Sequence, residues 1–254
     1  MRMRLVYLPF LLLATTVSAR TRVAHVLVAL CDNQYQGIVK VPAGIGNGQK
    51  PGTNLYWGAG YGVRTHFDRS AEWVRVPCVK STTTHILERA VWKHRDSAVY
   101  LVADAYDGRN IREATEDLLR FASGAMPLRI ELQDGGYIKA GGAADLVGYV
   151  GHDGLMDFAL DKEFPATNTG ARETIILACI SKRFFTPPLR KTGASPLLWT
   201  TGLMAPEAYT LKAALNGWVA HETNEAIRER AAVAYNTYQK CGINGARRLF
   251  ATGW

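Results

Sequence analysis

The segment VAHVLVALC, residues 23–31, decides the fold class of this chain. It is continuously apolar and rich in β-branched side chains. Runs of this kind form strands that are buried on both faces, as in a parallel sheet covered by helices. The pattern recurs at four later places: AVYLVADAYD (98–107), DLVGYV (145–150), ETIILACIS (173–181) and SPLLWTTG (195–202). We therefore expect five buried strands in one mostly parallel sheet.

Amphipathic segments separate and follow these strands. In residues 110–123 the apolar side chains recur at helical spacing on one face. Helices are also predicted at 206–222 and 223–240, and at 53–70 despite the glycines of that stretch. Shorter strands are expected at 72–79 and 86–94. Alternating strands and helices predict a three-layer α/β sandwich in which residues 20–254 form a single domain.

The first 19 residues have the pattern of a secretory signal peptide. A short basic segment precedes the apolar run LVYLPFLLLATTV, and small residues lead to an expected cleavage site after Ala19. The alternative is a retained membrane anchor. No other segment has the roughly 20 consecutive apolar residues of a membrane helix. We expect an exported protein, periplasmic or secreted, with no stable membrane span after cleavage.

The net charge and the cysteine pattern bear on nucleic-acid binding, on disulfides and on metal or cofactor sites. Loss of Arg2 and Arg4 with the signal would lower the net charge from +8 to +6, and the remaining basic residues are scattered, so nucleic acid is not an expected partner. The four cysteines allow two disulfides in three connectivities, or free thiols: Cys31, Cys78, Cys179 and Cys241. No C-x-x-C pair occurs, and neither a metal nor an organic cofactor is expected.

Other hydrolase and nucleotide-binding patterns are missing from the sequence. It has no G-x-S-x-G nucleophile elbow. The glycine-rich residues 44–52 lack the Gly-Lys-Ser/Thr ending of a phosphate-binding loop. We interpret this stretch as a long surface loop that covers the functional edge of the sheet.

Potentially reactive residues follow the predicted strands, where parallel sheets gather their chemistry. His152 ends the run LVGYV, and Cys179 ends the run TIILAC, 27 residues later. If these strands are neighbours, the two side chains share one edge of the sheet. A histidine can take the proton of a nearby thiol and make it a strong nucleophile. Asp153 either orients the imidazole or caps the turn.

The order strand, His, glycine turn, strand, Ala-Cys resembles the caspase, gingipain and legumain group of cysteine peptidases. His152 within GYVGHDG and Cys179 within IILACIS carry the resemblance. The strand and paired helical patterns of residues 195–235 look like those of CHAT-type and clostripain-like members. The likeness spans roughly residues 97–240, and its motifs are short.

The resemblance implies a caspase-like fold and a dyad that cleaves peptide bonds in a peptide or protein substrate. Backbone N–H groups near Gly151, Asp153 and Gly154 would stabilise the oxyanion, together with that of Cys179. The family usually has glycine directly after the histidine, whereas Asp153 stands there in this chain. The caspase Q-A-C-x-G signature is also absent.

The resemblance also implies a substrate pocket, which often carries an acidic residue where Arg or Lys is cleaved. The candidates are Asp32, Asp104 and, at the pocket border, Thr201. The alternative function is a catalytically inactive caspase-like domain that binds a partner outside the cytoplasm. A disulfide between Cys31 and Cys179 would exclude the peptidase interpretation.

Overall fold

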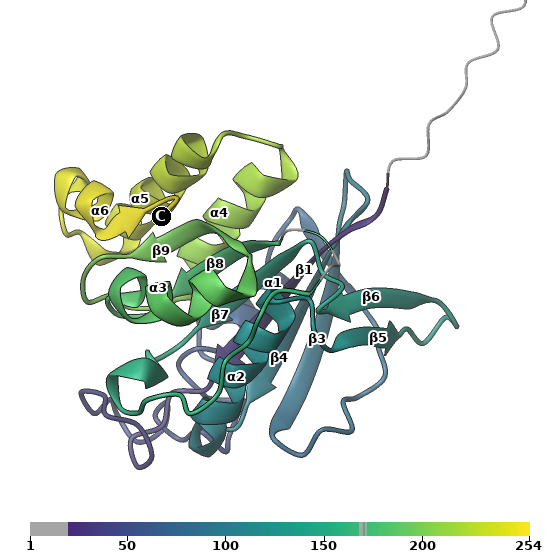
Figure 1. Cartoon of the computed structure of the whole chain (residues 1–254), viewed down its shortest axis with the longest axis horizontal. Coiled ribbons are helices and arrows are strands. Elements are labelled where there is room, and N and C mark those ends of the chain that lie inside the picture. The colour runs from purple at the N-terminus through teal and green to yellow at the C-terminus, as the bar shows by residue number, and fades with distance from the viewer. Residues whose placement is uncertain (1–19, 168–169, 171) are drawn as a thin grey trace, which may run out of the picture.

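The computed structural model of the chain describes residues 20–167, 170 and 172–254, so the expected signal peptide, residues 1–19, lies outside the described residues. A twisted sheet forms the centre, and helices cover both of its faces (Figure 1). Its eight strands follow the order β10-β9-β8-β7-β1-β4-β3-β2, and β5 and β6 form a separate hairpin. The three-layer α/β architecture predicted from the sequence is confirmed.

The strands are short and mostly buried. Their bounds are β1 Arg22–Ala29, β2 Trp73–Val76, β3 Ile86–His94, β4 Val99–Tyr106, β5 Pro127–Glu131, β6 Tyr137–Gly141, β7 Leu146–Val150, β8 Glu173–Leu177, β9 Ser195–Thr200 and β10 Phe250–Ala251. The five strands expected from apolar runs, β1, β4, β7, β8 and β9, form the parallel part of the sheet. The remaining pairings, β2 with β3, β3 with β4 and β9 with β10, are antiparallel.

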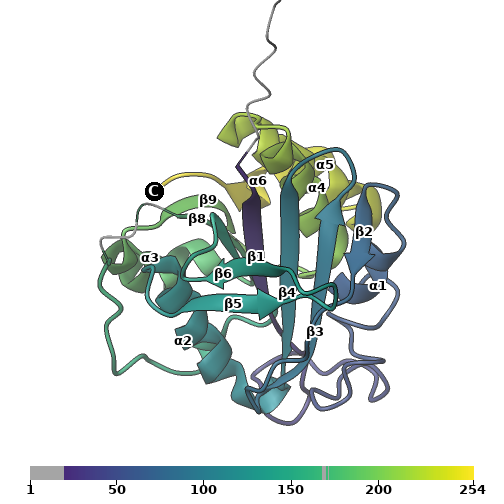
Figure 2. The same ribbon diagram turned by 90° about the vertical axis from the view of Figure 1, so that its right-hand side faces the viewer.

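The helices lie in two layers. Their bounds are α1 Val63–Asp68, α2 Ile111–Ala122, α3 Ser181–Thr192, α4 Ala208–Val219, α5 Asn224–Gln239 and α6 Ile243–Leu249. Buried residues of α2 and α3 join one core cluster with the β5–β6 hairpin, and buried residues of α1, α4, α5 and α6 join the other. Figure 2 shows the hairpin crossing the sheet on the α2 side.

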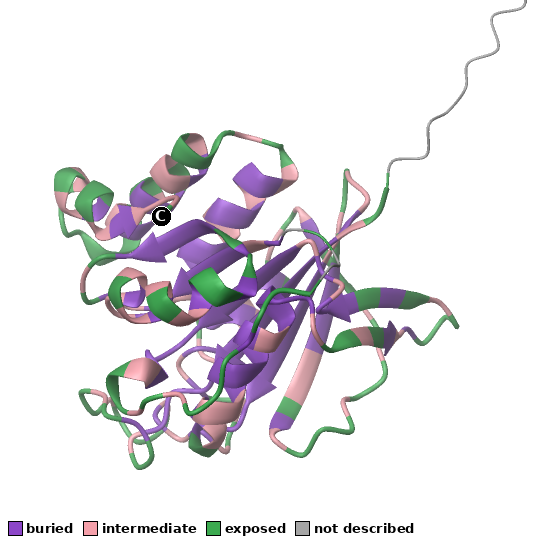
Figure 3. Ribbon diagram, viewed as in Figure 1, coloured by how far each residue is buried: buried purple, intermediate pink, exposed green. Residues whose placement is uncertain are grey.

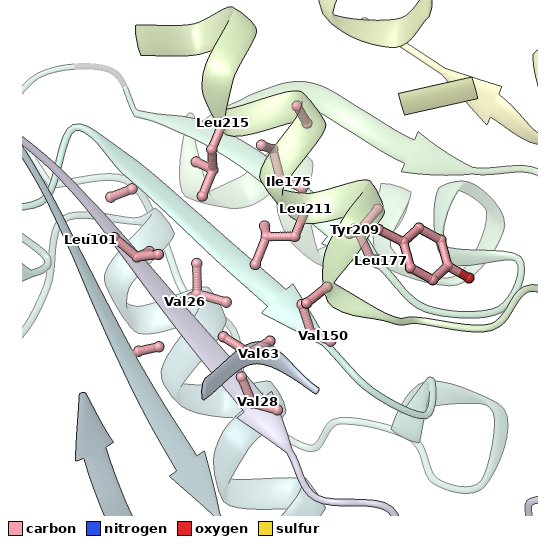
Figure 4. Close-up of a cluster of buried hydrophobic side chains, with 14 of the residues drawn as sticks. Val26, Val28, Val63, Leu101, Val150, Ile175, Leu177, Tyr209, Leu211 and Leu215 are labelled. Carbon is pink, nitrogen blue, oxygen red and sulfur yellow. The ribbon is translucent and has the colours of Figure 1, made fainter. Parts of the chain in front are cut away.

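Strand β1 lies at the middle of the sheet and contributes side chains to both core clusters. Val26 and Val28 face the α4 layer, while Leu27 and Ala29 face the α2 layer, as the two-residue period of a strand requires. Figure 3 shows that the central strands are buried along their length. Figure 4 shows Leu211 and Leu215 of α4 packed over the strands. This two-sided burial explains why the sequence of β1 is continuously apolar.

The helix predicted at 53–70 is shorter than expected. Only Val63–Asp68 is α-helical, and the residues before it form a series of turns. A Cβ at Gly58 would lie 2.1 Å from the carbonyl oxygen of Gly52, and one at Gly62 would lie 2.4 Å from the backbone of Trp57. The backbone of this segment therefore folds back on itself, which a regular helix does not allow.

The chain reverses direction across the sheet at a defined place. After β1 the chain builds β2, β3 and β4 on one side of β1. It then crosses to the other side, where β7 pairs with β1. The carboxyl ends of β1 and β7 thus flank a topological switch point, where open α/β sheets bind ligands. Within the described part of the chain, no helix has the length and apolar composition needed to cross a bilayer.

Candidate active site

His152 and Cys179 leave adjacent strands at the same level of the sheet. Strands β7 and β8 are parallel, and Val150 pairs with Leu177 at their carboxyl ends. Each of the two candidate residues lies two positions beyond this last pair. Cys179 packs against the core cluster that Val150 and Leu177 share with the α4 layer. The predicted adjacency of the two strands is confirmed.

His152 and Cys179 line one pocket of about 290 Å³. The connection after β1 contributes one wall, the turn after β7 a second and the connection after β9 a third. The other lining residues are Gly37, Ile38, Val39, Tyr56, Gly151, Met156, Leu203, Met204 and Pro206. Residues 37–39 of the loop between β1 and α1 therefore reach this edge, whereas the glycine-rich residues 44–52, which were expected to cover it, do not line the pocket.

Local contacts fix the backbone that presents His152. The Tyr149 hydroxyl donates to the His152 carbonyl oxygen at 2.8 Å. Gly151 has a φ of +151°, and a Cβ there would lie 2.7 Å from the carbonyl oxygen of Ala29. Glycine before the histidine therefore lets the end of β7 approach the end of β1.

Asp157 holds the imidazole of His152. Its Oδ2 lies 2.8 Å from Nε2, and the same oxygen accepts from the N–H of Gly37 at 2.9 Å. A carboxylate only accepts, so Nε2 carries the proton in this contact. Nδ1 has no hydrogen bond within the described residues, and it is the ring nitrogen left to take a proton. The contact with Asp157 therefore leaves Nδ1 available as a base.

Cys179 lies in a strained turn between β8 and α3. Its Sγ contacts the backbone N–H of Met204 at 3.4 Å and the Met204 carbonyl oxygen at 3.5 Å. Ile180, which follows, has a φ of +51°, a left-handed conformation that β-branched residues rarely adopt. Helix α3 begins at Ser181. Its N-terminus lies two residues after Cys179 in the chain.

All four cysteines are free thiols, so the disulfide between Cys31 and Cys179 does not form. Cys31 is buried, and burial raises the pKa of its thiol to about 11, although a hydrogen bond with Tyr56 opposes this shift. Burial and then the nearby Cys31 and Cys179 hold the pKa of the Tyr56 phenol well above its usual value. Cys31 is thus an inert thiol beneath the pocket, and Tyr56 is a neutral part of its floor.

Asp153 caps the turn and does not hold the imidazole. It is fully buried, and its Oδ1 accepts from the N–H of Leu155 at 3.0 Å at the start of a short 3-10 turn, Gly154–Met156. Its Oδ2 has no hydrogen-bond partner within the described residues. Burial, and secondarily the charge of Asp157, raise the pKa of Asp153 to about 7. The orienting role predicted for Asp153 therefore falls to Asp157.

The acidic residues predicted for a substrate pocket lie elsewhere. Asp32 is buried and accepts from the N–H groups of Gln34 and Tyr35 and from the side chain of Gln49. Asp104 lies inside β4 and not at its end, because the apolar run continues to Tyr106.

Asp104 is fully buried between basic partners. Both of its oxygens accept from Arg89 at 2.6 Å, and His25 contacts it at 3.0 Å. Burial alone would disfavour its charge, but these hydrogen bonds hold the pKa of Asp104 below its usual value. Neither Asp32 nor Asp104 lines the pocket.

Three further predicted residues are committed to other contacts. The hydroxyl of Thr201 donates to the carbonyl oxygen of Arg248 at 2.7 Å, away from the pocket. The N–H of Gly151 donates to the carbonyl oxygen of Leu177 at 3.2 Å. This N–H belongs to the sheet and does not serve an oxyanion. Gly154 lies inside the 3-10 turn, packed against the ring of Phe158.

Several residues of the site were not predicted from the sequence. Asp157 lies five residues after His152, and only the 3-10 turn brings it back to the ring. Gly37 and Met204 come from connections far away in the chain, so no local pattern marks them. The only local pattern that could have indicated Asp157 is the segment GHDGLMD, in which a second carboxylate follows His152 by five residues.

Comparison with known proteins adds no relative. No protein-family model matches the chain, and neither a curated protein nor a solved structure matches it. Across residues 20–167, 170 and 172–254, no group of three or more His, Cys, Asp or Glu side chains is arranged to hold a metal ion. The pocket and the groups that line it are therefore the features from which a function can be inferred.

Proposed function

We propose that this protein is an exported cysteine peptidase-like hydrolase with a caspase-like fold. The observation that carries the proposal is the pairing of His152 with Cys179 in one pocket, at the same step beyond two adjacent parallel strands. The contact between Asp157 and Nε2 supports it further, because it leaves Nδ1 without a hydrogen bond among the described residues and able to take a proton. The signal-like residues 1–19 support export.

The proposed reaction uses the two side chains in sequence. Nδ1 of His152 takes the Sγ proton of Cys179, and the thiolate attacks the carbonyl carbon of a peptide bond to form a C–S bond. The imidazolium, paired with Asp157, returns its proton to the leaving amine as the C–N bond breaks. Water, deprotonated by the same imidazole, then hydrolyses the thioester and regenerates the thiol. The substrate is a peptide or protein.

The oxyanion of the tetrahedral intermediate needs backbone donors. The N–H of Gly151 is engaged with Leu177, so the proposal assigns this role to N–H groups after His152 and to that of Cys179. A well-placed donor of this kind is worth roughly 3 kcal/mol of transition-state stabilisation.

One observation favours an alternative function. Within the described residues no hydrogen bond joins Sγ to the imidazole, and Sγ contacts Met204 instead. The alternative is a catalytically inactive caspase-like domain whose pocket binds a peptide or a partner. Catalytic hydrogen bonds are often long in a structure without substrate and shorten when it binds. We therefore keep the peptidase as the first proposal.

Peptide hydrolysis separates the two functions. A fluorogenic peptide library should be cleaved by the protein and by Cys241→Ser, the matched control at an exposed cysteine. Cleavage should fall to the background rate in Cys179→Ala and in His152→Ala. Asp157→Asn should lower kcat by roughly tenfold or more with KM and the unfolding midpoint nearly unchanged, because the amide still accepts from Gly37 but no longer stabilises the imidazolium.

Asp157→Glu should recover part of this loss, since it restores the carboxylate. Cleavage that persists in Cys179→Ala would assign the activity to another site. A properly folded protein that cleaves no peptide in the library would favour the binding module.

A further inference from the structure

The walls of the candidate pocket are apolar, and this composition points to the class of substrate. The pocket combines Ile38 and Val39 with Leu203, Met204 and Pro206, over the neutral phenol of Tyr56. His152 is the one titratable side chain besides Cys179 and Tyr56 among the described residues that line it. Pockets of this kind take apolar groups and use a few polar groups for orientation.

Three of these apolar side chains are unusually exposed for their type. Val39 is 92% exposed, Leu203 is 72% exposed and Met156 is 41% exposed. They come from three different connections, after β1, after β9 and after β7, yet all three line the same pocket. Single exposed apolar residues are common, but a convergent group around a pocket marks a binding surface.

The pocket offers no carboxylate to a basic substrate side chain. Asp32 and Asp104 are buried elsewhere with full sets of donors. Asp157 is the nearest acid of the site, and its Oδ2 already serves His152 and Gly37. A Lys or Arg side chain in this pocket would lose its hydration and meet no carboxylate among the lining residues, which is costly.

An acidic substrate side chain is disfavoured by the same reasoning. Among the described residues that line the pocket, none is a lysine or an arginine. An uncharged apolar side chain has no charge to remove from water on entry. It would cover the exposed faces of Val39, Leu203 and Met156.

We propose that the pocket is an apolar specificity subsite, and that the protein acts on peptides carrying a Leu-, Met- or Phe-like residue at the bond attacked by Cys179. This inference rests on the proposed peptidase function. It assigns specificity to Val39, in the connection after β1, and to Leu203, in the connection after β9. Neither residue forms a hydrogen bond with His152 or Cys179 in the described part of the chain.

Matched reactive peptides test this inference. Peptidyl acyloxymethyl ketones with Leu, Phe, Arg or Asp next to the ketone react when Sγ forms a thioether and the acyloxy group leaves as a carboxylate. Mass spectrometry of the intact protein gives the labelling rate at Cys179, with Cys179→Ala as the blank. The Leu and Phe probes should react at least tenfold faster than the Arg and Asp probes.

A charge placed on the wall should reverse this order. Leu203→Asp should slow the Leu probe at least fivefold and speed the Arg probe, because the new carboxylate supplies the missing counter-ion. Val233→Asp is the matched control, since Val233 is an exposed apolar residue on α5 outside the pocket, and it should leave all four rates unchanged.

The outcomes separate the two proposals. Faster labelling by the Arg or Asp probe would overturn the apolar subsite while leaving the cysteine peptidase intact. Equal rates for all four probes, or rates insensitive to Leu203→Asp, would also overturn the subsite. Labelling by none of the probes would overturn the peptidase itself and the subsite with it.

Discussion

Two carboxylates flank His152, and their surroundings give them opposite properties. Asp157 is 30% exposed and accepts two hydrogen bonds on one oxygen, so its charge is solvated and paired. Asp153 is fully buried and has an oxygen without a partner in the described part of the chain. Asp157 is thus the carboxylate that contacts the imidazole.

Asp153 should make the protein less stable at neutral pH than in mild acid. Its pKa in the folded state is about 7, against an ordinary value of 3.8, so between these values the folded state holds a proton that the unfolded state has released. The contribution of Asp153 to the free energy of unfolding therefore falls as the pH rises from about 4 to 7, by on the order of 4 kcal/mol. Asp153→Asn keeps an acceptor for Leu155 and should remove this dependence.

The measurement is the free energy of unfolding in urea at pH 5 and pH 8. Asp153→Asn should be more stable than the parent at pH 8, with a smaller difference at pH 5. Asp96→Asn, at an exposed acid, serves as the control and should follow the parent. An equal effect of Asp153→Asn at both pH values would contradict the assignment of a neutral, buried acid.

Reasoning from the sequence placed single residues correctly where they directly follow a strand. His152 and Cys179 come two residues after β7 and β8, so strand ends locate them. It was wrong for Asp104, because the apolar run of β4 continues past the acid and the residue is buried with Arg89. A single buried ion pair inside an apolar strand leaves no periodic signal.

At the level of elements, the ends of β1, β7 and β8 determine the site. Gly151 lets β7 approach Ala29 at the end of β1, and Ile180 turns the chain from β8 into α3 in a left-handed conformation. Residues held in such conformations persist where the surrounding structure demands them, and they gather at functional sites. The strained turn is what places Cys179 beside the pocket and the N-terminus of α3.

Gly151→Ala should therefore damage both the fold and the site. The added Cβ would lie 2.7 Å from the Ala29 carbonyl oxygen, which forces the strand ends apart. We expect a loss of about 1–3 kcal/mol in the free energy of unfolding, as for other overpacked positions. Gly44→Ala is the matched control, because nothing lies within 4 Å of a Cβ at that position.

Denaturant unfolding of the two variants gives this comparison directly. Gly44→Ala should equal the parent or exceed it slightly. A Gly151→Ala variant as stable as Gly44→Ala would show that the close approach of β7 to β1 does not constrain residue 151.

At the scale of the whole molecule, strand periodicity predicted the layers and the parallel sheet, because burial on both faces leaves continuous apolar runs. It did not predict the pocket walls. Val39, Met156 and Leu203 belong to three connections that are far apart in the sequence and meet at the pocket. Their positions depend on long-range contacts, such as the one between Gly37 and Asp157, that no short window of sequence contains.

Activation of Cys179 by His152 would change the pH dependence of Cys179 alkylation. The experiment uses Cys241→Ser protein, which removes the exposed thiol, and follows labelling by iodoacetamide with peptide mapping. An ordinary thiol loses about two to three orders of magnitude in rate between pH 9 and pH 6. We predict fast labelling of Cys179 at pH 6 that His152→Ala abolishes. Labelling at pH 6 that is slow, or that persists unchanged in His152→Ala, would show that His152 does not activate Cys179.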